Sequence, residues 1–428
     1  MNNPIRIRLP HYAWVIATVT FVAMLGAAGF RSVPGVMMDP LHAEFGWSHA
    51  TIGLAMSVNL ALYGLTAPFA AALMDRVGVR PVVCGAMTLI AAGTGLATLM
   101  NASWQLILLW GVLVGLGTGS CSMAFVATVA TRWFVARRGL VTGVLTAASA
   151  TGQLIFLPIV AALTQRYGWR TASLLVTAVA LAVVPVAGLL LRSFPADKGI
   201  PPYGSDEVVA RPAYVGGAAS AALRTLADAA RHPAFWLLAW SFAVCGASTN
   251  GLLQTHFIPA AGDRGMPATT AASLLALIGV FDVVGTIASG WLTDRVDSRV
   301  LLVVYYVGRG AALALLPALL RGHVTPSLWV FILFYGLDWV ATVPPTIALC
   351  REHFGDRSAV VFGWLFAAHQ LGAAFAATGA GYLRDALHSY DPAFYIAATL
   401  CVCGAVMCAM VPRVRRPAGE PEPVASLT

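Results

Sequence analysis

The chain has 428 residues, of which 59% are hydrophobic and 10% are charged, and its formal net charge is +8. With a mean hydropathy of +0.78, this composition excludes an ordinary soluble globular protein of that length. Most of the sequence falls into apolar runs of roughly 20 residues, each long enough to cross a lipid bilayer as a helix. We therefore expect an all-α membrane protein.

Twelve such runs follow one another along the chain. We expect the first to be a lasting helix, because Arg6 and Arg8 lead into a run that is too long for a signal peptide and has no A-x-A-like exit. The predicted transmembrane helices are Tyr12–Val36, Ala50–Leu73, Val82–Met100, Gln105–Thr128, Leu140–Leu163, Ala172–Leu191, Ala234–Ile258, Ala268–Leu292, Val300–Leu320, Ser327–Cys350, Ala359–Leu383 and Ala393–Val411.

The basic residues are distributed unevenly between the two sides of the membrane. If both termini are cytoplasmic, 19 Lys and Arg lie in the inner loops and five lie in the outer loops. By the positive-inside rule, this predicts a multi-pass protein of the cell inner membrane with both termini in the cytoplasm. The same distribution explains the net charge without a nucleic-acid partner.

An internal repeat divides the chain into two halves. Asp75-Arg76-x-x-x-Arg80 follows the second run, and Asp294-Arg295-x-x-x-Arg299 follows the eighth, 219 positions later. Phe134, Arg137 and Gly143 recur 220 positions later as Phe354, Arg357 and Gly363. The repeat predicts two pseudo-symmetric six-helix halves, 1–192 and 233–412, with a partly disordered cytoplasmic linker, 193–232, and a cytoplasmic tail, 413–428. Parallel halves of this kind are typical of transporters whose substrate site lies between them.

The two loops, Ala71–Arg80 and Gly290–Arg299, resemble the loop motif of the major facilitator superfamily, and the resemblance covers all twelve helices. Ala71 and Asp297 stand where the motif usually has glycine. The resemblance implies the major facilitator fold. It also implies a gating role for the loop charges, whose carboxylates and guanidinia bind neighbouring helix ends in the outward-facing state. The alternative is that both loops only set the topology.

Three further segments, Phe45–Gly78, Arg132–Gly143 and Gln254–Met266, resemble the monocarboxylate transporters and oxalate/formate exchangers within that superfamily. This branch implies a small organic anion as the substrate. Proton symport and anion exchange both remain open as the driving reaction.

Ionisable residues inside the predicted helices are few, and each needs a partner or a watery cavity. Asp282 lies about 18 Å of helix from Asp294, near the middle of the bilayer. Arg309, Asp338 and His369 lie at similar depth. Pro344-Pro345 predicts a break or bend in the tenth helix.

The resemblance assigns roles to two of the charged residues. Monocarboxylate transporters have a first-helix cation that matches Arg31 and an eighth-helix aspartate that matches Asp282. Arg31 would bind the substrate carboxylate, and Asp282 would carry the coupling proton. Thr286 stands where the family has an arginine. Arg309 either replaces that arginine or forms a structural buried pair with Asp338.

Further substrate contacts follow from position. His369 lies on a helix that lines the cavity in this fold, and it either binds substrate or a proton or is a packing histidine. Tyr63 and Asn250 occupy the repeat positions of Asp282 and Arg31.

We therefore expect a monomeric secondary transporter of a small carboxylate, coupled to protons or to a second anion. The seven cysteines show no metal-ligand spacing, and we expect no metal, no cofactor and no enzymatic activity. A drug or siderophore porter of the same fold and a non-transporting membrane sensor of organic acids are the alternatives.

Overall fold

The computed structural model describes residues 11–31, 33–47, 49–209, 217–321 and 326–413, and this part of the chain is almost entirely helical. The first half contains α1 (Tyr12–Arg31), α2 (Val33–Phe45), α3 (His49–Val77), α4 (Val79–Ala97), α5 (Ser103–Leu106), a π-helical segment (Ile107–Val114), α6 (Gly115–Ser120), α7 (Met123–Trp133), α8 (Arg138–Tyr167) and α9 (Trp169–Leu190).

The second half repeats this plan. It contains α11 (Pro233–Gly246), a π-helical segment (Ala247–Leu253), α12 (Gln254–Gly262), α13 (Ala268–Thr293), α14 (Ser298–Leu319), α15 (Pro326–Asp338), α16 (Val343–Phe354), α17 (Ser358–Leu387) and α18 (Asp391–Met410).

These helices make twelve membrane passes. Eleven stretches of the described chain are long and apolar enough to cross a membrane, and one of them, Leu328–Arg384, is 57 residues long. That stretch covers α16 and most of α15 and α17, and these three helices together make two passes. The twelve-helix architecture is therefore confirmed. Most boundaries differ from the predicted ones by a few residues. The difference that matters for the loop motif is at α3, which continues to Val77 and includes Asp75 and Arg76 in its last turn.

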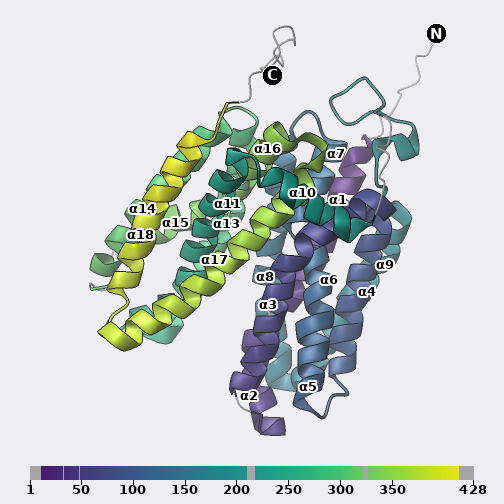
Figure 1. The fold of residues 1–428 in the computed structure, drawn as a ribbon. Helices are drawn as coiled ribbons and strands as arrows, with labels where there is room; N and C mark the ends of the chain where they lie inside the picture. Colours follow the sequence, from purple (N-terminus) through teal and green to yellow (C-terminus); the bar gives the residue numbers. More distant parts are fainter. Residues whose placement is uncertain (1–10, 32, 48, 210–216, 322–325, 414–428) are drawn as a thin grey trace, which may run out of the picture.

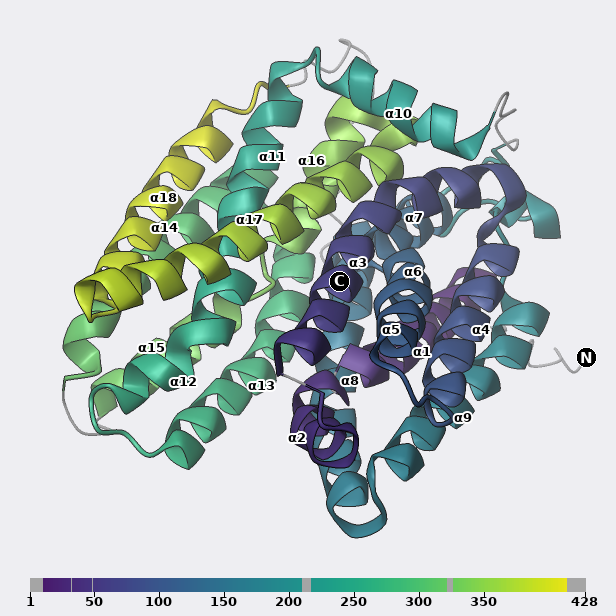
Figure 2. The ribbon, with the colours of Figure 1, turned by 60° about the horizontal axis from the view of Figure 1, so that its bottom comes forward.

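The two six-helix halves lie side by side and diverge toward one end (Figures 1 and 2). We call the opposite end, which carries the start of α1, the end of α18 and the linker, the linker end. The halves are packed most tightly toward it, where α8 crosses α13 and α3 crosses α17.

Two glycines permit these crossings. A Cβ on Gly143 would lie 2.6 Å from the carbonyl oxygen of Thr286, and a Cβ on Gly363 would lie 2.6 Å from the Cα of Pro68. Gly143 and Gly363 are repeat partners, and each allows a helix of the other half to approach until the two backbones are in contact. The internal repeat is thus expressed as two equivalent helix crossings.

The described part of the linker is fastened to both halves. The backbone N–H of Tyr203 donates to the carbonyl of Trp133 at 2.8 Å, and its ring packs on Trp14. Helix α10 (Ala218–Ala229) lies across the linker end between α3 and α17 (Figures 1 and 2). There Trp364 donates to the carbonyl of Ala222 at 3.1 Å. The linker therefore spans the junction between the two halves.

Candidate functional site

A cavity of about 680 Å³ lies between the two halves. Helices α3, α7 and α8 line it from the first half, and α11, α12, α13, α16, α17 and the π segment 247–253 line it from the second. Four residues expected at the site line this cavity, namely Tyr63, Asn250, Asp282 and His369. Arg31 closes α1, but its side chain lies outside the described part of the structure.

Asp282 is only 2% exposed and is held by two hydrogen bonds to the same oxygen. Its Oδ1 accepts from the Thr286 hydroxyl at 2.8 Å and from the backbone N–H of Val340 at 3.0 Å. The residue that departs from the family pattern, Thr286, is thus a direct partner of the buried carboxylate. Sequence spacing contained this signal, because Thr286 lies one helical turn after Asp282.

Val340 belongs to a four-residue break between α15 and α16, residues 339–342. The break precedes Pro344-Pro345, whose missing N–H groups prevent a continuous hydrogen-bond ladder. Side chains from neighbouring helices bind the backbone groups that have no partner within the helix. The Ser289 hydroxyl donates to the carbonyl of Ala341 at 2.5 Å, and Arg309 donates to the carbonyls of Asp338 at 2.6 Å and Trp339 at 3.2 Å.

Arg309 is fully buried and also forms the expected pair with Asp338, with Nε to Oδ2 at 2.6 Å. Its Nη1 lies 2.9 Å from the Cys245 sulfur. These bonds tie α14 to α15 and α11, whereas Asp282 holds the break from α13. Arg309 and Asp282 therefore bind adjacent backbone groups at this break from two sides. Loss of the Asp338 carboxylate would leave the buried Arg309 guanidinium without its counter-charge and would destabilise the break.

His369 lies at the closed end of the cavity among aromatic rings. Its ring stacks on Phe366 with centroids 5.8 Å apart and lies 4.8 Å from Phe242. Tyr63 of the first half meets Phe366 of the second edge to face at 5.2 Å. This part of the site is built jointly by both halves.

The two loop motifs lie at the linker end. The Asp294 carboxylate accepts from the backbone N–H groups of Gly139 at 2.7 Å and Leu140 at 2.9 Å, so it caps the first turn of α8 in the other half. Asp75 pairs with Arg132 of its own half.

The remaining motif arginines lie at the surface or pair locally. Arg295 donates to the carbonyl of Trp291 and covers its ring, and Arg299 pairs with Asp297. Arg76 and Arg80 are exposed.

A family model described as the Major Facilitator Superfamily matches residues 19–377. The chain is 28% identical to "Monocarboxylate transporter 13" of Rattus norvegicus, over 92% of this chain and 87% of that relative. It is 25% identical to "Uncharacterized MFS-type transporter YcxA" of Bacillus subtilis, over 89% and 90% of the two chains.

Solved structures share the fold. The E. coli fucose:proton symporter FucP has a TM-score of 0.68 and 16% identity, covering 94% of this chain and all of that one. The proton:xylose symporter XylE has a TM-score of 0.67 and 14% identity, covering 94% and 96%.

Proposed function

The chain belongs to the major facilitator superfamily of transporters, and from that premise we propose that it carries a monocarboxylate across the inner membrane by alternating access. The observation that carries the proposal is a cavity between the halves with a buried carboxylate, Asp282, in its wall. The relatives named as monocarboxylate transporters, which align over nearly the whole chain, support the substrate class.

The cavity and the crossings together suggest the conformational state. Tight packing at the linker end and divergence at the other end are what an outward-facing transporter needs, provided that both termini are cytoplasmic. In this scheme the substrate enters from the outside and rests against both halves. Motion of the halves about the crossings then opens the linker end.

We assign the coupling proton to Asp282 and the binding of the substrate carboxylate to Arg31. Both hydrogen bonds to Asp282 use Oδ1, so Oδ2 can carry a proton without displacing either donor. Protonation would remove the negative charge from the cavity wall when an anionic substrate enters. Arg31, at the end of α1, supplies a fork of N–H donors that suits a carboxylate.

Uptake into proteoliposomes tests the proposal. The purified protein is offered labelled lactate, pyruvate, formate, oxalate and aromatic acids, with and without an inward proton gradient. Accumulation that collapses with the gradient supports proton symport, and uptake only into vesicles preloaded with anion supports exchange. Binding without equilibration would contradict transport of these acids and favour a sensor, whereas uptake of large neutral compounds instead would favour a drug or siderophore porter.

Two variants test the assigned residues in the same vesicles. Arg31→Gln should abolish uptake while the protein remains folded and monodisperse. Asp282→Asn should retain anion exchange and lose proton-driven accumulation. Unchanged acidification of the lumen by the Asp282→Asn protein would show that the proton is carried elsewhere.

A further inference from the structure

The second half contains another hollow, a groove between α14 and α15 on the side away from the first half (Figures 1 and 2). Its volume is about 600 Å³. We call it the α14–α15 groove. Its α14 wall is a stripe of residues spaced three or four apart, namely Val304, Gly308, Ala312, Leu315 and Leu319. All five side chains are apolar or absent, so this wall offers a ligand only apolar contact.

The α15 wall of the groove is aromatic. The Phe331 and Tyr335 rings stack with centroids 5.1 Å apart and are both buried, whereas Phe334 is 65% exposed. The Tyr335 hydroxyl donates to the carbonyl of Ser248 at 2.8 Å, so its polar end is bound inside the protein. The α15 wall therefore presents aromatic carbon that needs no hydrogen bond from a ligand.

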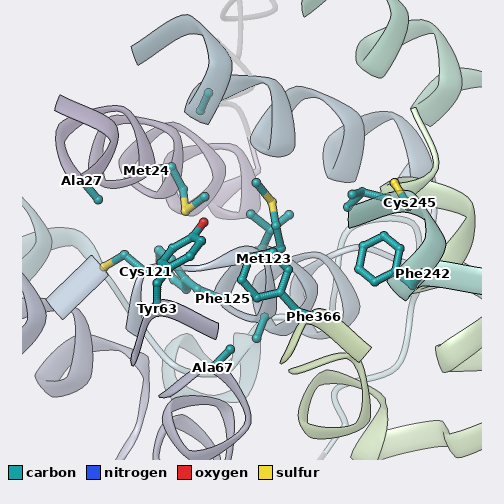
Figure 3. Close-up of a cluster of buried hydrophobic side chains, with 14 of the residues drawn as sticks. Met24, Ala27, Tyr63, Ala67, Cys121, Met123, Phe125, Phe242, Cys245 and Phe366 are labelled. Carbon is teal, nitrogen blue, oxygen red and sulfur yellow. The ribbon is translucent and has the colours of Figure 1, made fainter. Parts of the chain in front are cut away.

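A charge pair lies between the inner end of this groove and the cavity between the halves. Arg309 and Asp338 belong to the groove lining, and Arg309 Nη1 lies 2.9 Å from the sulfur of Cys245, which lines the cavity beside the buried cluster (Figure 3). The Arg309 guanidinium donates to Asp338, Trp339, Cys245 and Ser248. Its donors are thus bound within the protein, and the inner end of the groove asks for no polar ligand.

The groove is open at Gly308. Among the described residues, a Cβ at this position would meet nothing within 4 Å, whereas a Cβ on Gly310 would lie 3.1 Å from the carbonyl oxygen of Ala398 on α18. Small residues in membrane helices commonly allow close helix contact, as Gly310 does. Gly308 is not used in this way within the described chain, so space remains between α14 and α15 at its level.

The length of the groove corresponds to one leaflet of a bilayer. Helix α14 follows Asp294 of the linker end and runs toward the opposite end, and Arg309 lies in its middle. The α14 wall from Gly308 to Leu319 is roughly 16 Å long at 1.5 Å per residue. The hydrocarbon core of a bilayer is about 30 Å thick, so this wall runs from its middle to one surface. One acyl chain of the leaflet opposite the linker end has the same extent.

The surroundings of the groove decide what fills it. Val304, Leu315 and Phe334 are each more than half exposed, and exposed apolar side chains at this depth contact lipid. A protein helix is about 10 Å across and is too wide to enter between α14 and α15, which contact each other. An empty groove would forfeit dispersion contacts along both walls. A flexible hydrocarbon chain is narrow enough to restore them.

We propose that one acyl chain of a phospholipid, from the leaflet opposite the linker end, binds in the α14–α15 groove. The chain packs along the apolar stripe of α14 and the aromatic wall of α15, and its end reaches the level of the Arg309–Asp338 pair. The groove is thus a lipid site on the far side of the pair from the cavity. This inference goes beyond the proposed function and does not depend on the identity of the substrate.

Photo-cross-linking tests the site. The full-length protein is placed in nanodiscs of phosphatidylcholine, a small fraction of which carries a diazirine at the end of one acyl chain. After irradiation, the labelled residues are located by mass spectrometry. We expect label on the groove residues of α14 and α15 about fivefold above that on the exposed face of α4 around Gly85, because a chain in the groove has protein contacts on several sides.

Side chains of increasing size at position 308 should displace the chain. Gly308→Leu should lower the groove label about threefold and Gly308→Phe about tenfold, because the added groups take up the space that the chain needs. Gly85→Phe is the matched control, since Gly85 is exposed on α4 and a Cβ there likewise meets no described atom within 4 Å. It should leave the groove label unchanged. Elution of each variant as a monodisperse peak shows that it is folded.

Three results would overturn the inference. Equal label on the groove and on α4 in the parent protein would show only the contact that any membrane surface makes with lipid. An undiminished groove label in folded Gly308→Leu and Gly308→Phe would place the chain elsewhere. Dimers in native mass spectra with a groove protected from label would assign it to a second copy of the protein. None of these measurements uses uptake, so they stand apart from the test of monocarboxylate transport.

Discussion

The two copies of the D-R-x-x-x-R pattern occupy equivalent places in the two halves, yet their first carboxylates bind different partners. Asp294 reaches across to the first turn of α8 in the other half, whereas Asp75 stays within its own half and pairs with Arg132. The second copy therefore links the two halves to each other. The first copy links α3 to α7 within one half.

The neighbours of each aspartate explain the difference. A Cβ on Gly139 would lie 2.4 Å from the carbonyl oxygen of Gly290, so only two glycines permit this approach. Their repeat partners are Ala359 and Ala71, whose methyl groups would keep α17 and α3 further apart.

The partner of Asp75 is also absent from the second copy. Glu352 stands at the repeat position of Arg132, so the second copy has no arginine at that position. A motif therefore specifies where a charge lies, and the adjoining residues decide what it binds.

The largest effect should come from breaking the pair within the first half. Asp75→Asn leaves Arg132 mostly buried without its counter-charge, and loss of one member of such a pair costs about 3 kcal/mol. We expect a clear fall in the apparent Tm of the detergent-solubilised protein. The balance between outward-facing and inward-facing states should change little, because the pair does not cross the halves. A shift in spin-label distances between the halves would contradict this division of roles.

Gly139→Ala should act on the contact between the halves. The added methyl group meets the backbone of Gly290 and displaces Asp294 from the end of α8, and overpacking of this kind costs about 1–3 kcal/mol. We expect the linker end to open in a larger share of molecules, measured by double electron–electron resonance between labels on α8 and α13. Ala359→Gly, at the repeat position, is the matched control and should not open it.

Asp294→Asn should shift the same equilibrium by a smaller amount. The amide can still accept one hydrogen bond from α8 but loses the interaction of a charge with the helix N-terminus, which is worth about 1 kcal/mol. That corresponds to roughly a fivefold change in the state ratio. Equal shifts in Asp294→Asn and Asp75→Asn would remove the distinction between the two copies.

The smallest effect concerns the residue that replaces the motif glycine in the second copy. Gly78 of the first copy has a φ of +99°, and the N–H that follows it donates to Ser193 of the linker. Asp297 has an ordinary φ and caps α14 with its own carboxylate, which accepts from the N–H of Arg299. The bond from the Arg299 guanidinium holds the pKa of Asp297 below its usual value.

Because that pKa is lower in the folded protein, the carboxylate stabilises the fold fully above about pH 4 and loses this contribution as the pH falls further. Asp297→Ala should lower stability by about 0.5 kcal/mol at pH 7, since the side chain is partly exposed. The difference between the variant and the parent protein should shrink as the pH falls from 7 to 3. An equal difference at both pH values would mean that the carboxylate is not the cap.

Hydropathy was sufficient to predict the twelve passes, because a bilayer admits few alternatives to long apolar helices. It could not predict where α3 ends, since Asp75 and Arg76 lie in helical turns beyond the apolar run. Asp282 and His369 were predicted from their depth together with the family resemblance, and both line the cavity. The bond from the backbone N–H of Val340 to Asp282 was not predicted, because a contact between helices far apart in the sequence has no local sequence signature.

The break between α15 and α16 has a mechanical consequence. It divides one membrane pass into two short rods, of which α15 packs on α13 and α14 while α16 also contacts α8 and α17. The backbone groups at the joint are bound by side chains rather than by the helix itself. The two rods can therefore change their relative angle at the joint, where no helical hydrogen bond has to be broken.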